Sequence, residues 1–231
     1  MFSARKFIEV ATFRSGRNNP TSTKGMVLRD NFYGSLEDDV FRRDFTVNGL
    51  YFDLQNSEVI DYVGGLDDLK KLQINMIGNP SERFEEDPVR MIRAVRFKAK
   101  LKATIDPNLN KSILNNAHLI ENIPPARLYE EVIKLFHNEN SLEVFRELSN
   151  LDILKYLFPQ TTGDEFISAS LINTSQRIKI GSSVTPAFLF AVFLWSAQNK
   201  RFNELKKKKM SRIDLMIKAS EDVIKKQVQQ V

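Results

Sequence analysis

The stretch from Glu86 to Phe97 combines acids, a proline and arginines at the start of a predicted helix. Asp87 is a favourable N-cap and Pro88 suits the first helical position, so Glu86 and Asp87 should lie where backbone N–H groups are still free. Arg90 follows one turn later. A carboxylate beside a guanidinium matches the Watson–Crick edges of adenine and cytosine and mismatches those of guanine and uracil. The pattern therefore predicts a nucleotide-reading site; the alternative is an N-capping Asp with an ordinary i,i+3 ion pair.

The same helix is predicted to have two different faces. At about 100° per residue, three apolar side chains form one stripe and three arginines occupy another arc. The stripe is Ile92, Val95 and Ala99, and the arginines are Arg90, Arg93 and Arg96. We expect the apolar face to pack in the core and the basic face, through Arg93 and Arg96, to contact RNA.

A second polar cluster interrupts a strand-forming run that ends at Tyr51. The adjacent guanidiniums of Arg42 and Arg43 can hold a triphosphate, and the carboxylate of Asp44 can accept hydrogen bonds from ribose hydroxyls. In the structural alternative, Arg43 and Asp44 pair with each other and Asn48 caps a turn.

An isolated acid lies in a predicted strand over residues 6–14. Period-2 alternation puts Glu9 on the same face as Phe7, Ala11 and Phe13. A carboxylate among apolar neighbours needs a partner or a metal ion, unless the strand lies at a sheet edge with the carboxylate in water.

The elements that must position these residues follow from local patterns. Residues 15–30 are typical of a loop, and Ser35 with an acid three residues later predicts a helix start. Apolar runs over 50–54 and 59–63 predict a β-hairpin, and Gly64 and Gly65 end the sheet region. The chain beyond Gly78 is helical in pattern, with helices predicted after the opening one at 108–119, 125–136, 141–148, 186–198 and 211–228.

Composition limits the classes of site. The 231-residue chain has a formal net charge of +5 and 42% hydrophobic residues, which suits a globular protein and favours a polyanionic partner. The absence of cysteine excludes disulfides and thiolate metal sites, and two isolated histidines cannot form an imidazole cluster, so any metal must be bound by oxygen.

Two runs have simple interpretations. The apolar segment 187–195 is much shorter than the roughly 20 residues of a bilayer span, so we predict a buried helix and no membrane partner. The N-terminus lacks a secretory apolar region, which makes the cytoplasm the default compartment. The lysine run 206–209 predicts RNA-backbone contacts through Lys206 and Lys207, or else a solvated face.

Taken together, these stretches resemble the bacterial poly(A) polymerase and CCA-adding tRNA nucleotidyltransferase family, the second class of polymerase-β-like nucleotidyltransferases. The motifs lie at 8–14, 42–50, 61–69 and 86–90, and those at 123–131 and 185–190 are most similar to the poly(A) polymerase branch. The resemblance covers nearly the whole chain. It implies an α+β fold in which a partial head of antiparallel or mixed strands (1–63) is followed by a hinge (64–78), an all-α neck (79–140) and a helical body (141–231).

The resemblance also implies roles for single residues. Glu9 would be a catalytic carboxylate that binds Mg²⁺, and Arg127 with Glu130 would brace the base-reading group. The nucleotide-binding residues would be Arg43, Asp44, Asn48, Glu86, Asp87 and Arg90. The expected substrates are ATP and RNA 3′ ends, with in-line attack of the RNA hydroxyl on the α-phosphate and release of pyrophosphate.

The resemblance leaves three activities to separate. These are adenylyl transfer to RNA 3′ ends, CCA addition to tRNA, and RNA binding by a non-catalytic remnant. The family has a glycine-rich loop and an Asp-x-Asp pair upstream of the Glu9 strand, whereas this chain begins at Met1, and Glu37-x-Asp39 lies in a predicted helix start. We therefore expect the polypeptide alone to add few or no nucleotides, and a separate complementing head polypeptide would restore activity.

Overall fold

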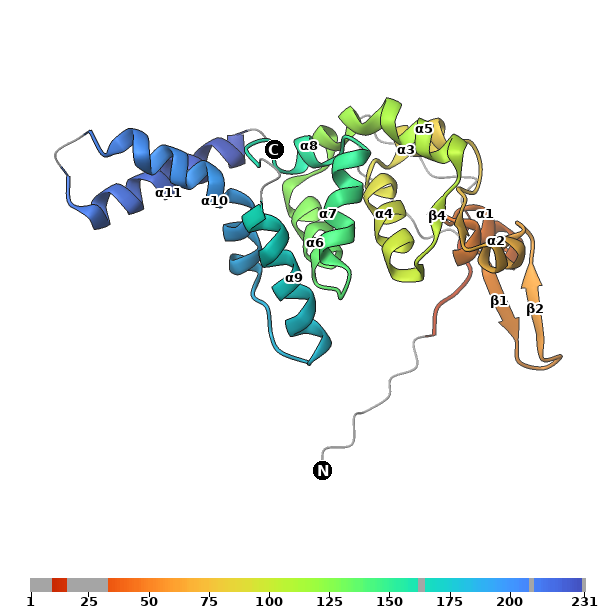
Figure 1. Ribbon diagram of the computed structural model, residues 1–231. Helices are drawn as coiled ribbons and strands as arrows, with labels where there is room; N and C mark the ends of the chain where they lie inside the picture. Colours follow the sequence, from red (N-terminus) through yellow and green to blue (C-terminus); the bar gives the residue numbers. More distant parts are fainter. Residues whose placement is uncertain (1–9, 16–32, 162–164, 208–209, 230–231) are drawn as a thin grey trace.

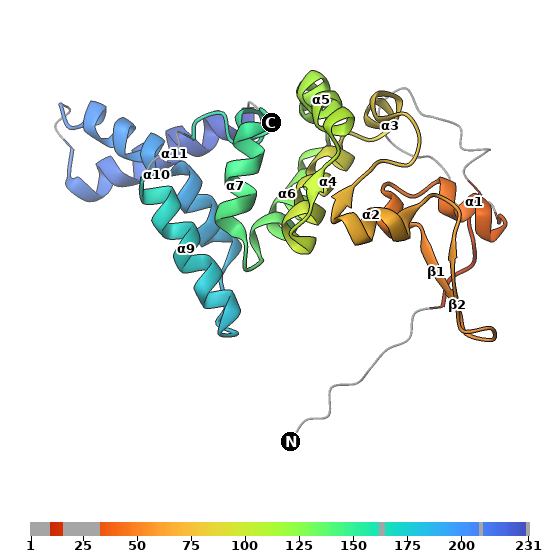
Figure 2. The same ribbon diagram turned by 45° about the vertical axis from the view of Figure 1, so that its right-hand side comes forward.

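The computed structural model describes residues 10–15, 33–161, 165–207 and 210–229. They form an elongated molecule, with a β-hairpin at one end, packed helices in the middle and a pair of long helices at the other end (Figure 1). A view turned by 45° keeps this order (Figure 2). The last helix runs back toward the centre, where Gln227 donates to the carbonyl of Leu157 at 2.9 Å.

The N-terminal part contains short elements. They are α1 (Leu36–Phe41), the 3₁₀-helix η1 (Thr46–Asn48), β1 (Leu50–Asp53), β2 (Glu58–Asp61), α2 (Gly65–Lys71) and β3 (Gln73–Ile74). The predicted helix start at Ser35 is confirmed, because Ser35 and Asp38 form a reciprocal capping box. The predicted hairpin is also confirmed, with Leu50 opposite Asp61 in an antiparallel β1–β2 pair.

The strand predicted over residues 6–14 is not found in its described part. Within residues 10–15, only Arg14 forms a bridge, an isolated antiparallel one with Tyr33. A strand needs a hydrogen-bonded neighbour along its length, and no strand of the described sheets is paired with this segment.

Residues 64–78, predicted as a hinge, contain helix α2 and strand β3. Asp61 accepts hydrogen bonds from three backbone N–H groups at the start of α2, including that of Gly65 at 3.0 Å. A Cβ on Gly65 would lie 2.2 Å from the carbonyl oxygen of Thr46, so this close contact requires glycine. Strand β3 pairs in parallel with β4 (Thr104–Ile105), which ties the segment to the helical part.

The remaining described chain is helical. Its helices are α3 (Pro80–Glu86), α4 (Val89–Leu101), α5 (Pro107–Asn116), η2 (Ala117–Asn122), α6 (Pro125–Phe136), α7 (Ser141–Asn150), α8 (Leu154–Leu157), α9 (Glu165–Lys179), α10 (Pro186–Leu205) and α11 (Arg212–Gln229). Helix α6 has the predicted bounds. The helix predicted over 108–119 is two helices, because the α-helix ends at Asn116 and a 3₁₀-helix continues the chain.

One hydrophobic core runs from Phe45 in the N-terminal part to Phe193 in α10. The predicted stripe of α4 lies in this core, since Ile92, Val95 and Ala99 are all buried. A second, smaller cluster joins α10 to α11 and contains Leu205, Leu215 and Ala219.

The apolar segment of α10 is only half buried, which corrects the prediction of a buried helix. Leu189, Val192 and Phe193 face the core, whereas Phe188 and Trp195 are exposed. Trp195 stacks on the exposed ring of Phe166 in α9, with ring centroids 5.3 Å apart. No helix of the described residues has the length and apolar character needed to cross a membrane.

Candidate functional site

The junction between α3 and α4 creates the candidate site. Asp87 has extended backbone angles, as expected for a residue before proline, and it separates the two helices. Its carboxylate accepts a hydrogen bond from the backbone N–H of Val89 at 3.2 Å, which is the contact of an N-cap. The predicted helix start at Asp87 and Pro88 is therefore found, but a short helix that the sequence had not indicated as separate precedes it.

Asp87 and Arg90 do not pair with each other in the described chain. The second carboxylate oxygen of Asp87 accepts from Arg127 Nη2 of α6 at 2.6 Å. Arg90 donates through Nε to Asp44 at 2.9 Å and through Nη1 to Glu86 at 2.7 Å. The structural alternative of an i,i+3 ion pair is therefore wrong, because each residue has partners on other segments.

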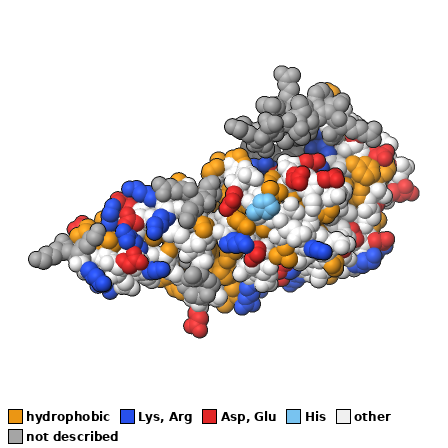
Figure 3. All heavy atoms as spheres, turned by 90° about the horizontal axis from the view of Figure 1, so that it is seen from above, with side chains coloured by type: hydrophobic (Ala, Val, Ile, Leu, Met, Phe, Trp, Pro, Cys, Tyr) orange, Lys and Arg blue, Asp and Glu red, His pale blue; other side chains and the backbone are white. Residues whose placement is uncertain are grey.

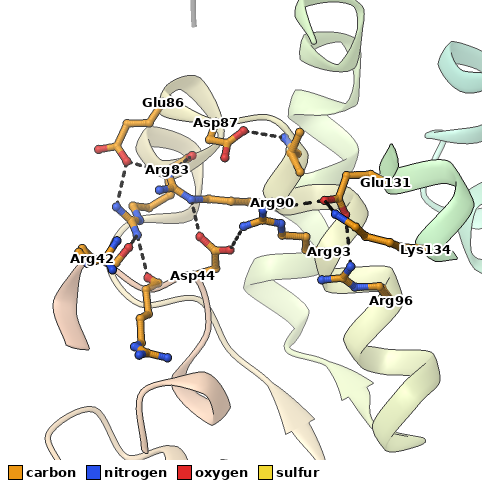
Figure 4. Close-up of polar contacts among 12 residues, drawn as sticks. Arg42, Asp44, Arg83, Glu86, Asp87, Arg90, Arg93, Arg96, Glu131 and Lys134 are labelled. Atoms are coloured by element: carbon orange, nitrogen blue, oxygen red, sulfur yellow. Dashed lines mark hydrogen bonds and ion pairs between the residues drawn. The ribbon is translucent and has the colours of Figure 1, made fainter. Parts of the chain in front are cut away.

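Asp44 connects the N-terminal part to α4. Its two oxygens accept from Arg90 Nε at 2.9 Å and Arg93 Nη1 at 2.7 Å, and Figure 4 shows Asp44 between these two guanidiniums. Burial alone would raise the pKa of Asp44, but the hydrogen bonds from Arg93 and Arg90 more than offset it and lower the pKa. The carboxylate is therefore charged at neutral pH and holds both arginines in fixed orientations.

Arg83 of α3 joins the two polar clusters, and the sequence analysis had not identified it. Its Nη2 donates to the carbonyls of Arg42 at 2.9 Å and Arg43 at 2.7 Å, while Nη1 donates to Glu86 at 2.9 Å. Glu86 thus accepts from both Arg83 and Arg90. The spacing of Arg83 and Glu86, three residues apart near a helix end, was the available local signal.

Helix α6 supplies the residues behind the junction. Glu131 is buried and accepts from Lys134 at 3.0 Å and from Arg96 at 3.4 Å, and it lies 3.9 Å from Arg93. Glu130, the expected bracing residue, is exposed, so the acid that contacts α4 is Glu131. Figure 4 shows Glu131 facing Arg93 and Arg96 from the neighbouring helix.

The second cluster is organised by Asp39, a buried residue of α1. Its oxygens accept from Arg42 Nε at 2.8 Å and from Arg43 Nη2 at 3.1 Å, and Tyr51 donates a short hydrogen bond to it. Burial would raise the pKa of Asp39, but the bonds from Tyr51 and Arg42 lower it to about 2. Arg43 and Asp44 do not pair with each other, and the carbonyl of Asn48 accepts from Arg43 Nη1 at 3.0 Å.

The residue that the sequence predicts to bind a metal ion is Glu9. Glu9 is outside the described residues. Among those described, no group of three or more His, Cys, Asp or Glu side chains could hold a metal ion. The carboxylates of Asp44, Glu86 and Asp87 each accept from arginines, which suits positioning rather than metal binding. The described residues therefore do not by themselves fit the expected Mg²⁺ ions.

The predicted RNA contacts fall into two groups. Arg93 and Arg96 are partly exposed and pair with Asp44 and Glu131, at the side of the junction. Lys206 and Lys207 are exposed at the end of α10. Seen from above, basic and acidic side chains alternate at the end of the molecule formed by α10 and α11 (Figure 3).

Two family models match the chain. The Poly A polymerase head domain matches residues 1–75, and the probable RNA and SrmB-binding site of polymerase A matches residues 103–164. Poly(A) polymerase I of Salmonella typhi is 44% identical over 208 residues, which are 82% of this chain and 45% of the relative. The CCA-adding enzyme of Limosilactobacillus reuteri is 40% identical over 141 residues, which are 61% of this chain and 35% of the relative. The chain thus spans less than half the length of these relatives.

Solved structures share the fold. A CCA-adding enzyme in an apo form aligns with a TM-score of 0.69 and 24% identity, over 91% of this chain and 50% of that one. A tRNA nucleotidyltransferase complexed with a primer tRNA and an incoming ATP analogue aligns with a TM-score of 0.61 and 21% identity, over 86% of this chain and 73% of that one.

Proposed function

The chain belongs to the family of bacterial poly(A) polymerases and CCA-adding enzymes, and we propose that its function is template-independent adenylyl transfer, the addition of AMP from ATP to RNA 3′ ends. The higher identity and the wider coverage of the poly(A) polymerase relatives support this branch. The part of the reaction that the described residues can perform is nucleotide selection and substrate positioning.

The arrangement of Asp87 and Arg90 is the observation that carries the proposal. Each is held by a separate partner, so neither neutralises the other. Arg90 Nη2 has no hydrogen bond to a described residue, and each oxygen of Asp87 can accept a further bond beyond those from Val89 and Arg127. An exocyclic amine can donate to Asp87 while the adjacent ring nitrogen accepts from Arg90.

The remaining nucleotide contacts are part of the same proposal. Arg43 and Asn48 lie beside the sugar and phosphates of the bound nucleotide, and Asp44 orients Arg90 while accepting from the ribose. Glu86 accepts from Arg90 and thereby fixes the direction of its free nitrogen. Mg²⁺, which supplies charge neutralisation in such phosphoryl transfers, is expected to be bound with the help of Glu9.

Nucleotide selectivity tests this function. The dissociation constants of ATP, CTP, GTP and UTP are measured by calorimetry with the 231-residue chain. We expect ATP and CTP to bind about tenfold or more tightly than GTP and UTP, because the wrong edges leave Asp87 and Arg90 unpaired. Equal affinities for all four nucleotides would overturn the proposal.

CCA addition to tRNA is the second candidate, since adenine and cytosine present the same edge to Asp87 and Arg90. The similarity to CCA-adding enzymes favours it independently. Incorporation of labelled AMP and CMP into an RNA 3′ end by the chain completed with a head polypeptide separates the two, with long AMP tails expected for the adenylyltransferase. Growth by two cytidylates and one adenylate on tRNA would instead assign CCA addition.

A further inference from the structure

Helix α11 carries apolar side chains on two opposite faces. Leu215, Ala219 and Val223 lie on the inner face and are buried, and the first two pack against α10. At about 100° per residue, four β-branched residues fall within an arc of about 60° on the opposite face. This outer stripe consists of Ile213, Ile217, Ile224 and Val228, which are between 53% and 71% exposed.

A row of exposed β-branched residues is not explained by the helix itself. Such side chains lose rotamer freedom in a helix and favour it less than Ala, Lys or Glu do. Single exposed apolar side chains are ordinary on protein surfaces, whereas a contiguous stripe marks a contact surface. The outer stripe extends about 22 Å along α11, at the end of the molecule that α10 and α11 form (Figure 1).

One flank of the outer stripe carries opposite charges at its two ends. Asp214 lies in the first turn of α11 and Lys225 near its C-terminus, and both are exposed. Neither forms an ion pair with a described residue, and the carboxylate of Asp214 accepts from the hydroxyl of Ser211 at 2.7 Å. Glu221, between them on the same flank, lies 4.0 Å from Lys218 of the same helix. The flank is therefore acidic at its beginning and basic at its end.

The outer stripe is symmetric about its centre, which lies just after Ser220 in the chain. Ile213 and Val228 are equally far from this centre. Ile217 and Ile224 form a second equidistant pair. When two copies of one helix pack antiparallel about such a centre, each residue of a pair lies opposite the other residue of that pair. The symmetry thus places apolar residues opposite apolar residues along the whole stripe.

We infer that α11 pairs antiparallel with α11 of a second copy of this chain through the outer stripe, so that the chain forms a homodimer. Equal flanks meet in this arrangement, and Asp214 lies beside the partner's Lys225 on one side of the centre. By symmetry, Lys225 lies beside the partner's Asp214 on the other side. The small side chain of Ser220 lies where the two helices cross, which allows them to approach closely.

A parallel pairing fits this helix less well. In a parallel pair, the flank of Asp214 and Lys225 would meet the opposite flank of the partner helix, where Met216 and Gln227 carry no charge. Both charges would then stay unpaired. The amide of Gln227 also donates to the carbonyl of Leu157, so that flank already packs against the rest of the chain. The charges of α11 therefore favour the antiparallel orientation.

Sedimentation equilibrium of the 231-residue chain tests the dimer. Two stripes of this length with their flanks bury roughly 1,000 Å², near the lower limit of specific interfaces, so we expect a dissociation constant of roughly micromolar size. Ile217→Glu should weaken the dimer about a hundredfold or more, because it buries unpaired charges near the centre. Ile172→Glu, at an exposed position on α9, is the matched control. A monomer at all concentrations, larger assemblies in place of a dimer, or a dimer that Ile217→Glu leaves unchanged would overturn the inference.

Charge reversal tests the antiparallel orientation. Asp214→Lys makes both ends of the flank basic and Lys225→Asp makes both ends acidic, so each variant alone should dimerise about tenfold more weakly than wild type. An equimolar mixture of the two variants should form a heterodimer of nearly wild-type affinity, because every facing pair is then opposite in charge. Damage to the fold of α11 could not be repaired by mixing. A mixture that dimerises no better than its components would overturn the antiparallel pairing and with it the inference.

A cross-link tests the point at which the helices cross. The chain has no cysteine, so Ser220→Cys introduces its single thiol. Disulfides form between residues whose Cα atoms are less than about 7 Å apart, a condition that residues at the crossing of two close-packed helices meet. Oxidation by dissolved oxygen should therefore give a linked dimer for Ser220→Cys and not for Ser149→Cys, at an exposed position on α7. Equal cross-linking of both variants, or none in Ser220→Cys, would contradict the inference.

Discussion

Individual guanidinium groups determine the geometry of this site, because each has five donors in fixed directions. Arg90 uses Nε for Asp44 and Nη1 for Glu86 and the Arg83 carbonyl. The direction of its last nitrogen therefore depends on two carboxylates from different segments. In the proposed site, Glu86 can thus influence which base is accepted through its hydrogen bond from Arg90.

Asp44→Asn tests the importance of the most connected carboxylate. We expect the free energy of unfolding at pH 7 to fall by roughly 2–3 kcal/mol, since two partly buried arginines lose their charged partner. The folded pKa of Asp44 lies below its ordinary value of 3.8. Its contribution is therefore complete above pH 3.8 and is lost as pH falls through the lowered pKa. Urea unfolding is measured from pH 7 to pH 2, and the difference in the free energy of unfolding between variant and wild type should decrease only below about pH 4. A difference that stays constant over this pH range would contradict the prediction.

Arg127→Ala tests the brace on the base-reading acid. Asp87 would keep its hydrogen bond from Val89 but lose the 2.6 Å bond from Arg127, so its carboxylate would be less well oriented. We expect the preference for ATP over GTP to fall about tenfold, with a smaller loss in Arg127→Lys. Calorimetric titrations with both nucleotides measure this ratio. An unchanged ratio in Arg127→Ala would show that Asp87 needs no brace.

At the scale of helices and strands, the features that could be predicted are those that depend on residues close together in the sequence. The capping box at Ser35, the hairpin and the bounds of α6 follow from residues within one or two turns of each other. The polar composition of α9, with serines, asparagine and threonine, masked its helical pattern. The hinge at 64–78 is an expectation from the family resemblance, and the glycines there do not predict it, because Gly65 is required by a close contact with Thr46.

The partners within the site could not be predicted from spacing. Asp44 and Arg90 are 46 residues apart, and Asp87 and Arg127 are 40 apart, so only the packing of α3, α4 and α6 brings them together. Glu131 was predictable in principle. It falls between Leu128 and Leu135 on the buried stripe of α6, whereas Glu130 points outward.

Ser35→Ala tests how helix α1 supports the arginine pair. The variant removes the side-chain acceptor for the N–H of Asp38, which should cost about 1 kcal/mol and loosen the first turn of α1. Because Asp39 lies in that helix, we expect faster hydrogen exchange at residues 36–42 than in wild type. Ser149→Ala, at an exposed position in the last turn of α7, is the matched control. Equal exchange at 36–42 in both variants would mean that α1 is held by its tertiary contacts alone.

In the elongated molecule, two groups of basic residues lie at different places along its length. The arginines of α4 lie in the middle, whereas Lys206 and Lys207 lie at the end formed by α10 and α11 (Figure 1). That end has its own small core around Leu215 and is attached to the main body by hydrogen bonds from Gln160 and Gln227. An RNA strand whose 3′ end reaches the α3–α4 junction would have to run along the molecule to touch both groups.

The salt dependence of RNA binding tests this path. Each contact between a lysine and a phosphate of single-stranded RNA contributes about 0.7 to the slope of log affinity against log salt. The double variant Lys206→Glu with Lys207→Glu should therefore decrease the magnitude of this slope by about 1.4 for a long oligonucleotide. The slope should be unchanged for an oligonucleotide of a few nucleotides, which cannot reach from the α3–α4 junction to the end of α10. Fluorescence anisotropy with short and long poly(A) at several salt concentrations measures both. Lys111→Glu, at an exposed position on α5 outside both groups, is the control for the reversal of a single charge. An equal decrease of the slope for both RNA lengths, or no decrease for either, would exclude an extended path from the nucleotide site to the end of α10.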